Sequence, residues 1–193
     1  MVAKKNNRLD VDDPYSLLPP VASFQLTSED LTHQEPLGFG QTAEGGSVSP
    51  QLSWSGCPSE TRSFMLTCVD LDSPHEGGMC LWLVADIPVT VRSIMSGIST
   101  SMVKALASRF FRPASSIGVD EALDLRNDRG TLGFAGANPP KGSGVHRYFF
   151  AIHALDVEHL DLPHGRRTAP DLATATAIPH TIGRAVLMGT HQR

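Results

Sequence analysis

The chain has 193 residues, of which 40% are hydrophobic, and it carries a formal net charge of -4. This length suits one domain with a substantial core, and the charge gives no electrostatic reason to bind nucleic acid or an acidic membrane surface. No apolar run approaches the roughly 20 residues that a membrane-spanning helix needs, so we expect no transmembrane segment.

The first 21 residues predict a flexible N-terminal arm, followed by a single domain over residues 22–193. The arm is charged at its start and offers no apolar stretch before a cleavage pattern, so it does not resemble a signal peptide. The three cysteines show no CxxC spacing, and an odd number of cysteines does not favour a disulfide framework. We therefore expect a cytoplasmic protein, with export by another route left open.

Short apolar or alternating runs follow along the chain, and Gly, Pro, Ser and Asn cluster between them. Short apolar runs separated by turn residues are typical of an antiparallel sandwich or barrel, so we expect a mainly β fold. The predicted strands are residues 22–28, 63–72, 80–88, 146–155 and 184–190.

Two segments favour helix instead, residues 100–112 and 169–182. The first is only moderately periodic, and its arginines and lysine are typical of a solvated outer face. A lid or a dimer contact is the alternative for this segment, so a homodimer stays open.

The familiar catalytic and binding motifs are absent. There is no GxSxG, no GxxxxGK[ST] and no HExxH, and the eight histidines are scattered. We therefore expect no bound metal and no cofactor, and the chemistry has to come from a constellation of separate residues.

Two carboxylates, Asp70 and Asp72, close the predicted strand in CVDLDSP. Alternation along a strand places both on the apolar side. Strand-end aspartates commonly accept hydrogen bonds from turn N–H groups, and this structural role suits Asp72. The role of Asp70 stays open, because a DxD pair without phosphate-binding partners is a weak indication of a metal site.

His146 opens the strand HRYFFAIHAL and shares its side with Tyr148, Phe150, Ile152 and Ala154. A polar ring at the head of an apolar row either bonds to the preceding loop or lines a pocket. The residues alone favour the first alternative.

Several motifs, in order, resemble those of the phosphatidylethanolamine-binding protein family, especially its bacterial YbhB/YbcL-type branch. They are SPQLSWSG, DLDSP for the family's DPDxP, RNDRG, GANPPKGSGVHRY for its GxxPPxGxGxHRY, and RAVLMGTH. The resemblance implies an antiparallel, Greek-key β-sandwich with a few short peripheral helices. It also implies a pocket at one end that takes small anions, formed by Asp70, Asn138, Pro139, Pro140 and His146.

The chain departs from the family pattern where the pocket is expected. Leu81 stands before the aromatic Trp82, where the family usually has a histidine, and Leu71 replaces the proline of DPDxP. One lost hydrogen bond to a charged group forfeits roughly 1.5–3 kcal/mol, which lowers phosphate affinity by about one to two orders of magnitude. Leu81 and Trp82 would then shape a more apolar pocket beside Asp70 and His146.

The first functional hypothesis is a binding protein for a small molecule, either an anion or a hydrophobic metabolite. The alternative is an enzyme in which Asp70 and His146 perform acid–base chemistry, such as isomerisation, addition or cyclisation, on a small hydrophobic substrate. Inhibition of a protein partner ranks third, because no feature of the chain indicates a target.

Overall fold

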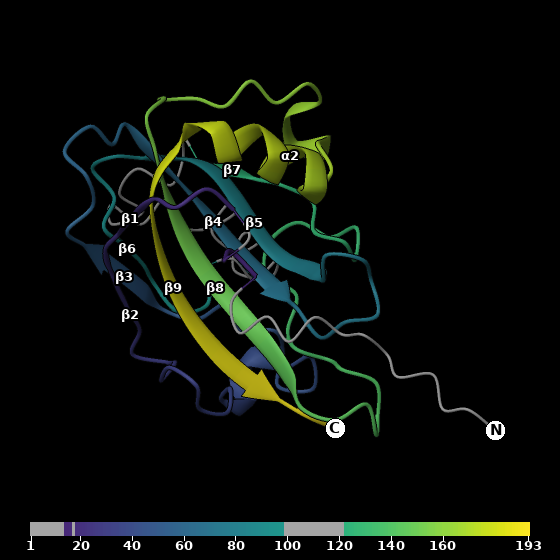
Figure 1. Ribbon diagram of the computed structural model, residues 1–193. Helices are drawn as coiled ribbons and strands as arrows, with labels where there is room; N and C mark the ends of the chain where they lie inside the picture. Colours follow the sequence, from purple (N-terminus) through teal and green to yellow (C-terminus); the bar gives the residue numbers. More distant parts are fainter. Residues whose placement is uncertain (1–13, 17, 99–121) are drawn as a thin grey trace, which may run out of the picture.

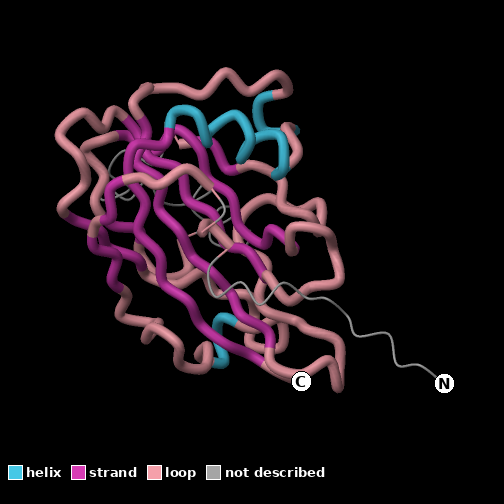
Figure 2. The backbone as a smooth tube through the Cα atoms, in the orientation of Figure 1, coloured by secondary structure: helices cyan, strands magenta, loops and turns pink. Residues whose placement is uncertain are grey.

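The computed structural model describes residues 14–16, 18–98 and 122–193 (Figure 1). Within these ranges lie nine strands, one α-helix and three short 3-10 turns (Figure 2). The strands are β1 (Ala22–Ser23), β2 (Gln25–Thr27), β3 (Leu52–Ser55), β4 (Ser63–Asp70), β5 (Met79–Pro88), β6 (Ser93–Ile94), β7 (Leu123–Asp124), β8 (His146–Leu155) and β9 (Thr181–His191). The helix is α2 (Pro170–Ala177), and the turns are η1 (Phe39–Gln41), η2 (Gly165–Arg167) and η3 (Ile178–His180).

The strands form two sheets. The larger has six strands in the order β1-β9-β8-β4-β5-β7, and the smaller has three in the order β2-β3-β6. All neighbours are antiparallel except the two-residue strand β1, which runs parallel to β9. The predicted mainly β architecture is confirmed, with one short α-helix in the described part of the chain.

The main core lies between the two sheets. The alternation predicted for β8 is confirmed, because Tyr148, Phe150, Ile152 and Ala154 all belong to this core. They meet Trp54 and other apolar side chains of the smaller sheet. Burying this face supplies most of the driving force that holds the layers together, at about 25 cal/mol per Å² of apolar area.

The opposite face of the large sheet is also covered. Helix α2 packs through Ala173 and Ala177 on Met65, Leu83 and neighbouring side chains. Since β4 begins at this end of the sheet and finishes at the other, α2 lies away from the Asp70 end of β4 (Figure 1).

A polar network lies on this outer face beneath Tyr15, a residue of the predicted arm. The Tyr15 hydroxyl is 2.9 Å from Oγ1 of Thr67, and that oxygen is 3.2 Å from Nε2 of His153. Nε of Arg184 donates to Nδ1 of His153 at 3.3 Å, and the guanidinium also lies over the Tyr15 ring. Because Arg184 can only donate, His153 carries its single hydrogen on Nε2.

The predicted elements match the structure best where they are long. The predicted strand 22–28 is split at Phe24 into β1 and β2, which join different sheets. The predicted helix 169–182 is also too long, since α2 ends at Ala177 and Pro179 cannot donate the next helical hydrogen bond. The predicted helix 100–112 lies outside the described residues.

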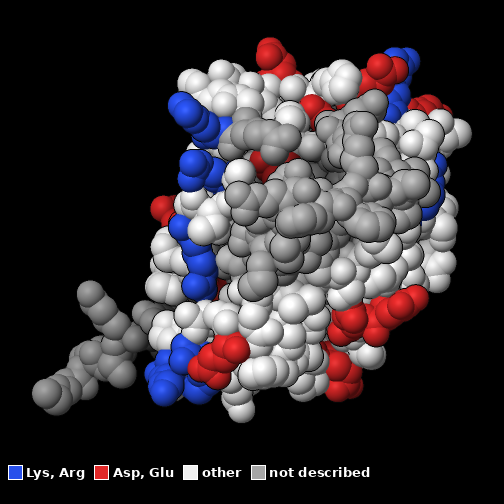
Figure 3. Space-filling view, turned by 180° about the vertical axis from the view of Figure 1, so that it is seen from behind, with Lys and Arg blue, Asp and Glu red and all other residues white. Residues whose placement is uncertain are grey.

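On the face in Figure 3, many of the basic side chains follow the left edge, and acidic side chains are seen at the top and at the lower right. In the described ranges, no helix is both long and apolar enough to cross a bilayer.

Candidate functional site

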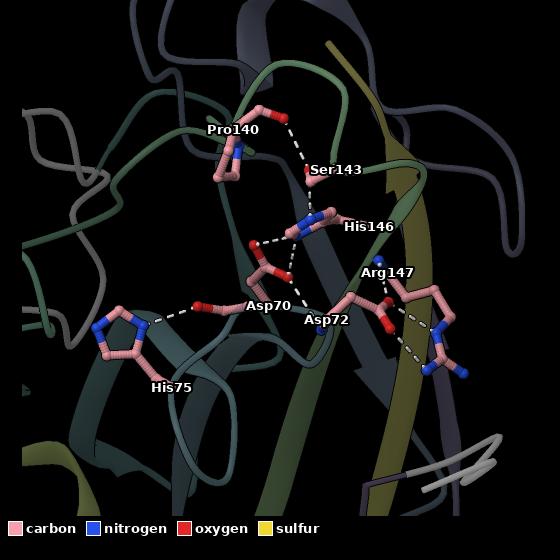
Figure 4. Close-up of polar contacts among 8 residues, drawn as sticks. Asp70, Asp72, His75, Pro140, Ser143, His146 and Arg147 are labelled. Atoms are coloured by element: carbon pink, nitrogen blue, oxygen red, sulfur yellow. Dashed lines mark hydrogen bonds and ion pairs between the residues drawn. The ribbon is translucent and has the colours of Figure 1, made fainter. Parts of the chain in front are cut away.

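A buried hydrogen-bonded pair of side chains joins the last residue of β4 to the first residue of β8. Nδ1 of His146 lies 2.9 Å from Oδ1 and 3.0 Å from Oδ2 of Asp70 (Figure 4). His146 is 1% exposed and Asp70 is 5% exposed. The antiparallel register of β4 and β8, in which Asp70 is opposite Tyr148, brings together two groups that are 76 residues apart in the sequence.

Ser143 completes a chain of contacts that the sequence did not reveal. Its Oγ is 2.8 Å from Nε2 of His146 and also donates to the carbonyl oxygen of Pro140 at 2.7 Å. Nδ1 of His146 faces a carboxylate that can only accept, so this nitrogen carries a hydrogen. The two ring nitrogens of His146 are therefore fixed in different roles, one toward Asp70 and one toward Ser143.

Asp72 is engaged by a different partner. It accepts from the Arg147 backbone N–H at 2.9 Å and from the guanidinium through Nε at 2.9 Å and Nη2 at 3.0 Å. Burial raises the pKa of Asp72, but the hydrogen bonds and charge of Arg147 outweigh it and lower the pKa overall. Because β4 ends at Asp70, the predicted alternation does not extend to Asp72, and the two carboxylates serve separate contacts.

The predicted Asn138, Pro139 and Pro140 lie in the loop that leads to β8. Pro139 is buried and Pro140 is exposed, with its carbonyl oxygen turned to Ser143 (Figure 4). Oδ1 of Asn138 accepts from the Arg193 guanidinium, so the C-terminal residue is tied to this loop. The structure thus brings the loop, His146 and Asp70 together.

Leu81 and Trp82 lie in β5, next to β4. Cys68 is opposite Trp82 and Val69 is opposite Cys80, so Leu81 is the extra residue of a bulge. Strict alternation would place Leu81 and Trp82 on opposite faces, yet both belong to the core between the sheets and both are 1% exposed. The bulge therefore turns the Leu81 side chain toward the same interior as Trp82.

Asn127 braces this part of β5 from the RNDRG turn. Its amide nitrogen donates to the carbonyl oxygens of Leu81 at 3.4 Å and Gly133 at 2.9 Å. Its oxygen accepts from the backbone N–H groups of Arg129 and Thr131. The residue is 2% exposed, and its role required the three-dimensional contacts to be recognised.

The Tyr148 hydroxyl is on a side chain that is 1% exposed, and burial, the negative charge of Asp70 and a hydrogen bond with Asp70 raise the pKa of Tyr148 far above its ordinary value. A second buried donor, Nε1 of Trp82, has no hydrogen-bond partner among the described residues, and its side chain is also 1% exposed. Leaving such a donor unsatisfied costs about 1–3 kcal/mol, which an acceptor atom would recover.

The assembled groups suit hydrogen bonding and proton transfer. An imidazole between a carboxylate and a hydroxyl can accept a proton on one nitrogen while the other stays fixed. In the described part of the chain, no three His, Cys, Asp or Glu side chains gather in a way that would hold a metal ion.

Comparison with known proteins places this chain in a family. The family model described as "Phosphatidylethanolamine-binding protein" matches residues 27–192. The Escherichia coli protein YbhB is 36% identical over 147 residues, covering 74% of this chain and 84% of YbhB. Escherichia coli YbcL is 38% identical over 146 residues, covering 72% of each chain.

The solved structure of YbcL has a similar fold. That protein is described as a new member of the mammalian PEBP family, and its structure superposes with a TM-score of 0.75 at 30% identity. The superposition covers 89% of this chain and 99% of YbcL. Sequence and structure agree that the chain belongs to the phosphatidylethanolamine-binding protein family, in its bacterial YbhB/YbcL branch.

Proposed function

We propose that the chain binds a small molecule at the end of the large sheet where Asp70 and His146 meet. The ligand is a hydrogen-bond acceptor carried on an apolar body. Membership of a family named for ligand binding supports the first part, and the chemistry of the surrounding side chains supports the second.

The observation that carries this proposal is the buried Trp82 indole N–H, which has no partner among the described residues and belongs to the strand next to β4, whose last residue is Asp70. Buried polar groups in proteins are nearly always satisfied, so this unpartnered N–H needs an explanation. A carbonyl or ether oxygen of a ligand would satisfy a neutral donor without bringing a second negative charge near Asp70.

The identity of residue 81 argues against free phosphate as the preferred ligand. Leu81 is buried and apolar, so it offers no donor to a dianion. Nε2 of His146 is already engaged by Ser143, and a phosphate oxygen would have to replace that hydroxyl. Both features favour a neutral or weakly charged acceptor.

A second candidate function is acid–base catalysis on a small hydrophobic metabolite, including isomerisation, addition or cyclisation. It is favoured by the contact between His146 and Ser143, because Ser143 is only half-buried. The histidine could therefore exchange a proton with a group outside the core while Asp70 holds its other nitrogen.

The two tryptophans provide an internal comparison for testing the proposal. Trp54 is also buried with an unpartnered Nε1, but it lies on β3 of the smaller sheet. A short-chain methyl ketone, which is neutral and accepts one hydrogen bond, is titrated into the protein while the two indole N–H signals are followed by NMR. We expect the Trp82 signal to shift and the Trp54 signal to stay.

The Tyr148→Phe variant provides a second test, because it removes the hydroxyl that contacts Asp70 and keeps the ring. The ketone should then bind more weakly. Equal shifts of both indole signals, or none at any ketone concentration, would reject the proposed site.

A further inference from the structure

We propose that Ser143 is a nucleophile, and that Asp70, His146 and Ser143 together transfer acyl groups from small carboxylic esters to water. The inference deepens the proposed function and rests on it, since the ester carbonyl would occupy the same site. No residue in the chain lies in a GxSxG motif, so this arrangement is visible only in three dimensions.

The geometry is that of a nucleophile, a base and an orienting acid. Ser143 Oγ lies 2.8 Å from Nε2 of His146, and Nδ1 lies 2.9 Å from Asp70 Oδ1. Both distances fall within the 2.6–3.2 Å that is typical of an activated serine. Asp70 is held in turn by the backbone N–H of Asp72, which donates to Oδ1 at 3.2 Å.

The proton positions are compatible with this role. Ser143 has one hydroxyl hydrogen, which can go either to Nε2 of His146 or to the carbonyl oxygen of Pro140. Pro140 also accepts from the Ser143 backbone N–H at 3.1 Å, so it keeps a donor when the hydroxyl turns to the ring. With His146 neutral and its hydrogen on Nδ1, the hydroxyl donates to Nε2, which is the arrangement that nucleophilic attack requires.

The three groups run from the interior to the surface. Asp70 and His146 are buried, whereas Ser143 is half-buried and lies between the exposed residues Gly142 and Gly144. Both glycines have positive φ, and a Cβ built on either would meet no atom within 4 Å. The loop that carries Ser143 is therefore at the surface, and its two glycines add no side chain next to Ser143.

The reaction can be written with atoms and charges in balance. As Ser143 Oγ bonds to the carbonyl carbon of the ester, its proton passes to Nε2 of His146. The imidazolium, stabilised by Asp70, returns the proton to the leaving alkoxide oxygen as the carbon–oxygen bond breaks, which releases the alcohol. Water then repeats the sequence on the acyl-serine, releases the carboxylic acid and restores Ser143.

The test uses the full-length protein and para-nitrophenyl acetate, whose leaving group is readily followed by absorbance. We expect a burst of nitrophenolate equal to the protein present, and peptide mapping should place the acetyl group on Ser143. Ser143→Ala should abolish the burst, and Asp70→Asn should slow it at least about 100-fold, the size of a general-base contribution. Ser59→Ala removes an exposed serine far from the site and should change nothing.

Acetylation of another residue, or a burst that persists in Ser143→Ala, would overturn the inference. If Asp70→Asn does not fold, the natural protein and Ser143→Ala decide the matter, through the burst and the site of acetylation. The ketone titration is run on the same preparation. Ketone binding without acylation would reject only the nucleophile, whereas acylation of Ser143 without ketone binding would reject only the proposed ligand site.

Discussion

His153 should make the stability of this protein fall steeply in mild acid. Its ring is 2% exposed on the outer face of the large sheet, where Nδ1 accepts from Arg184 and Nε2 contacts Thr67. Burial, and after it the positive charge of Arg184, lowers the pKa of His153 from 6.5 to about 3. Protonation of Nδ1 would remove the Arg184 hydrogen bond and leave two positive charges in contact.

The sign of the effect follows from which state binds the proton. Between pH 6.5 and about 3 the unfolded chain carries a protonated His153 and the folded chain does not. The free energy of unfolding therefore rises with pH across this window. At about 1.4 kcal/mol per pH unit, the loss relative to neutral pH is about 2 kcal/mol near pH 5 and about 3 kcal/mol near pH 4.

Urea unfolding at a series of pH values measures this dependence. His153→Phe should be less stable at neutral pH, because it loses the contacts with Thr67 and Arg184, but its stability should vary less with pH. The matched control is His164→Gln, since His164 is exposed and its replacement should leave the natural slope intact. An equally steep acid dependence in His153→Phe would refute the reasoning.

Two further changes test the supports of the site. Asp72→Asn weakens the ion pair with Arg147 and should cost about 2 kcal/mol in urea unfolding at neutral pH. Since the pKa of Asp72 is lowered in the folded state, the loss of unfolding free energy caused by Asp72→Asn should shrink as pH falls and the natural carboxylate becomes protonated. A loss that does not depend on pH would contradict the ion pair. Asn127→Ala leaves the carbonyl oxygens of Leu81 and Gly133 with fewer donors and should lower the free energy of unfolding by about 2–3 kcal/mol. An unchanged free energy of unfolding would show that Asn127 does not support β5.

The long strands could be predicted from sequence because burial imposes a regular pattern on them. The range 146–155 was predicted with the bounds that the structure has, and its inward row is the one expected from alternation. The two- to four-residue strands β3, β6 and β7 were not predicted. They are too short to show a period, and their pairing depends on partners distant in the sequence.

The site could be predicted only in part from the sequence, for a similar reason. The meeting of Asp70 with His146 was implied by the resemblance to the family, and the register of β4 and β8 produces it. The bulge at Leu81 and the contact of Ser143 with His146 depend on local backbone geometry that no residue pattern encodes. Asp72 was also predicted to bind the ligand, which stays a prediction, and in the structure both of its oxygens accept hydrogen bonds from Arg147.

The most direct test of the central claim is the affinity for inorganic phosphate of the natural protein and of Leu81→His, measured by calorimetry with Leu81→Met as the apolar control. We predict that phosphate binds Leu81→His about 10- to 100-fold more tightly than it binds the natural protein, as one restored hydrogen bond to a charged group allows. Leu81→Met should match the natural protein. Equal phosphate affinity in all three proteins would contradict the claim that Leu81 has changed the class of ligand.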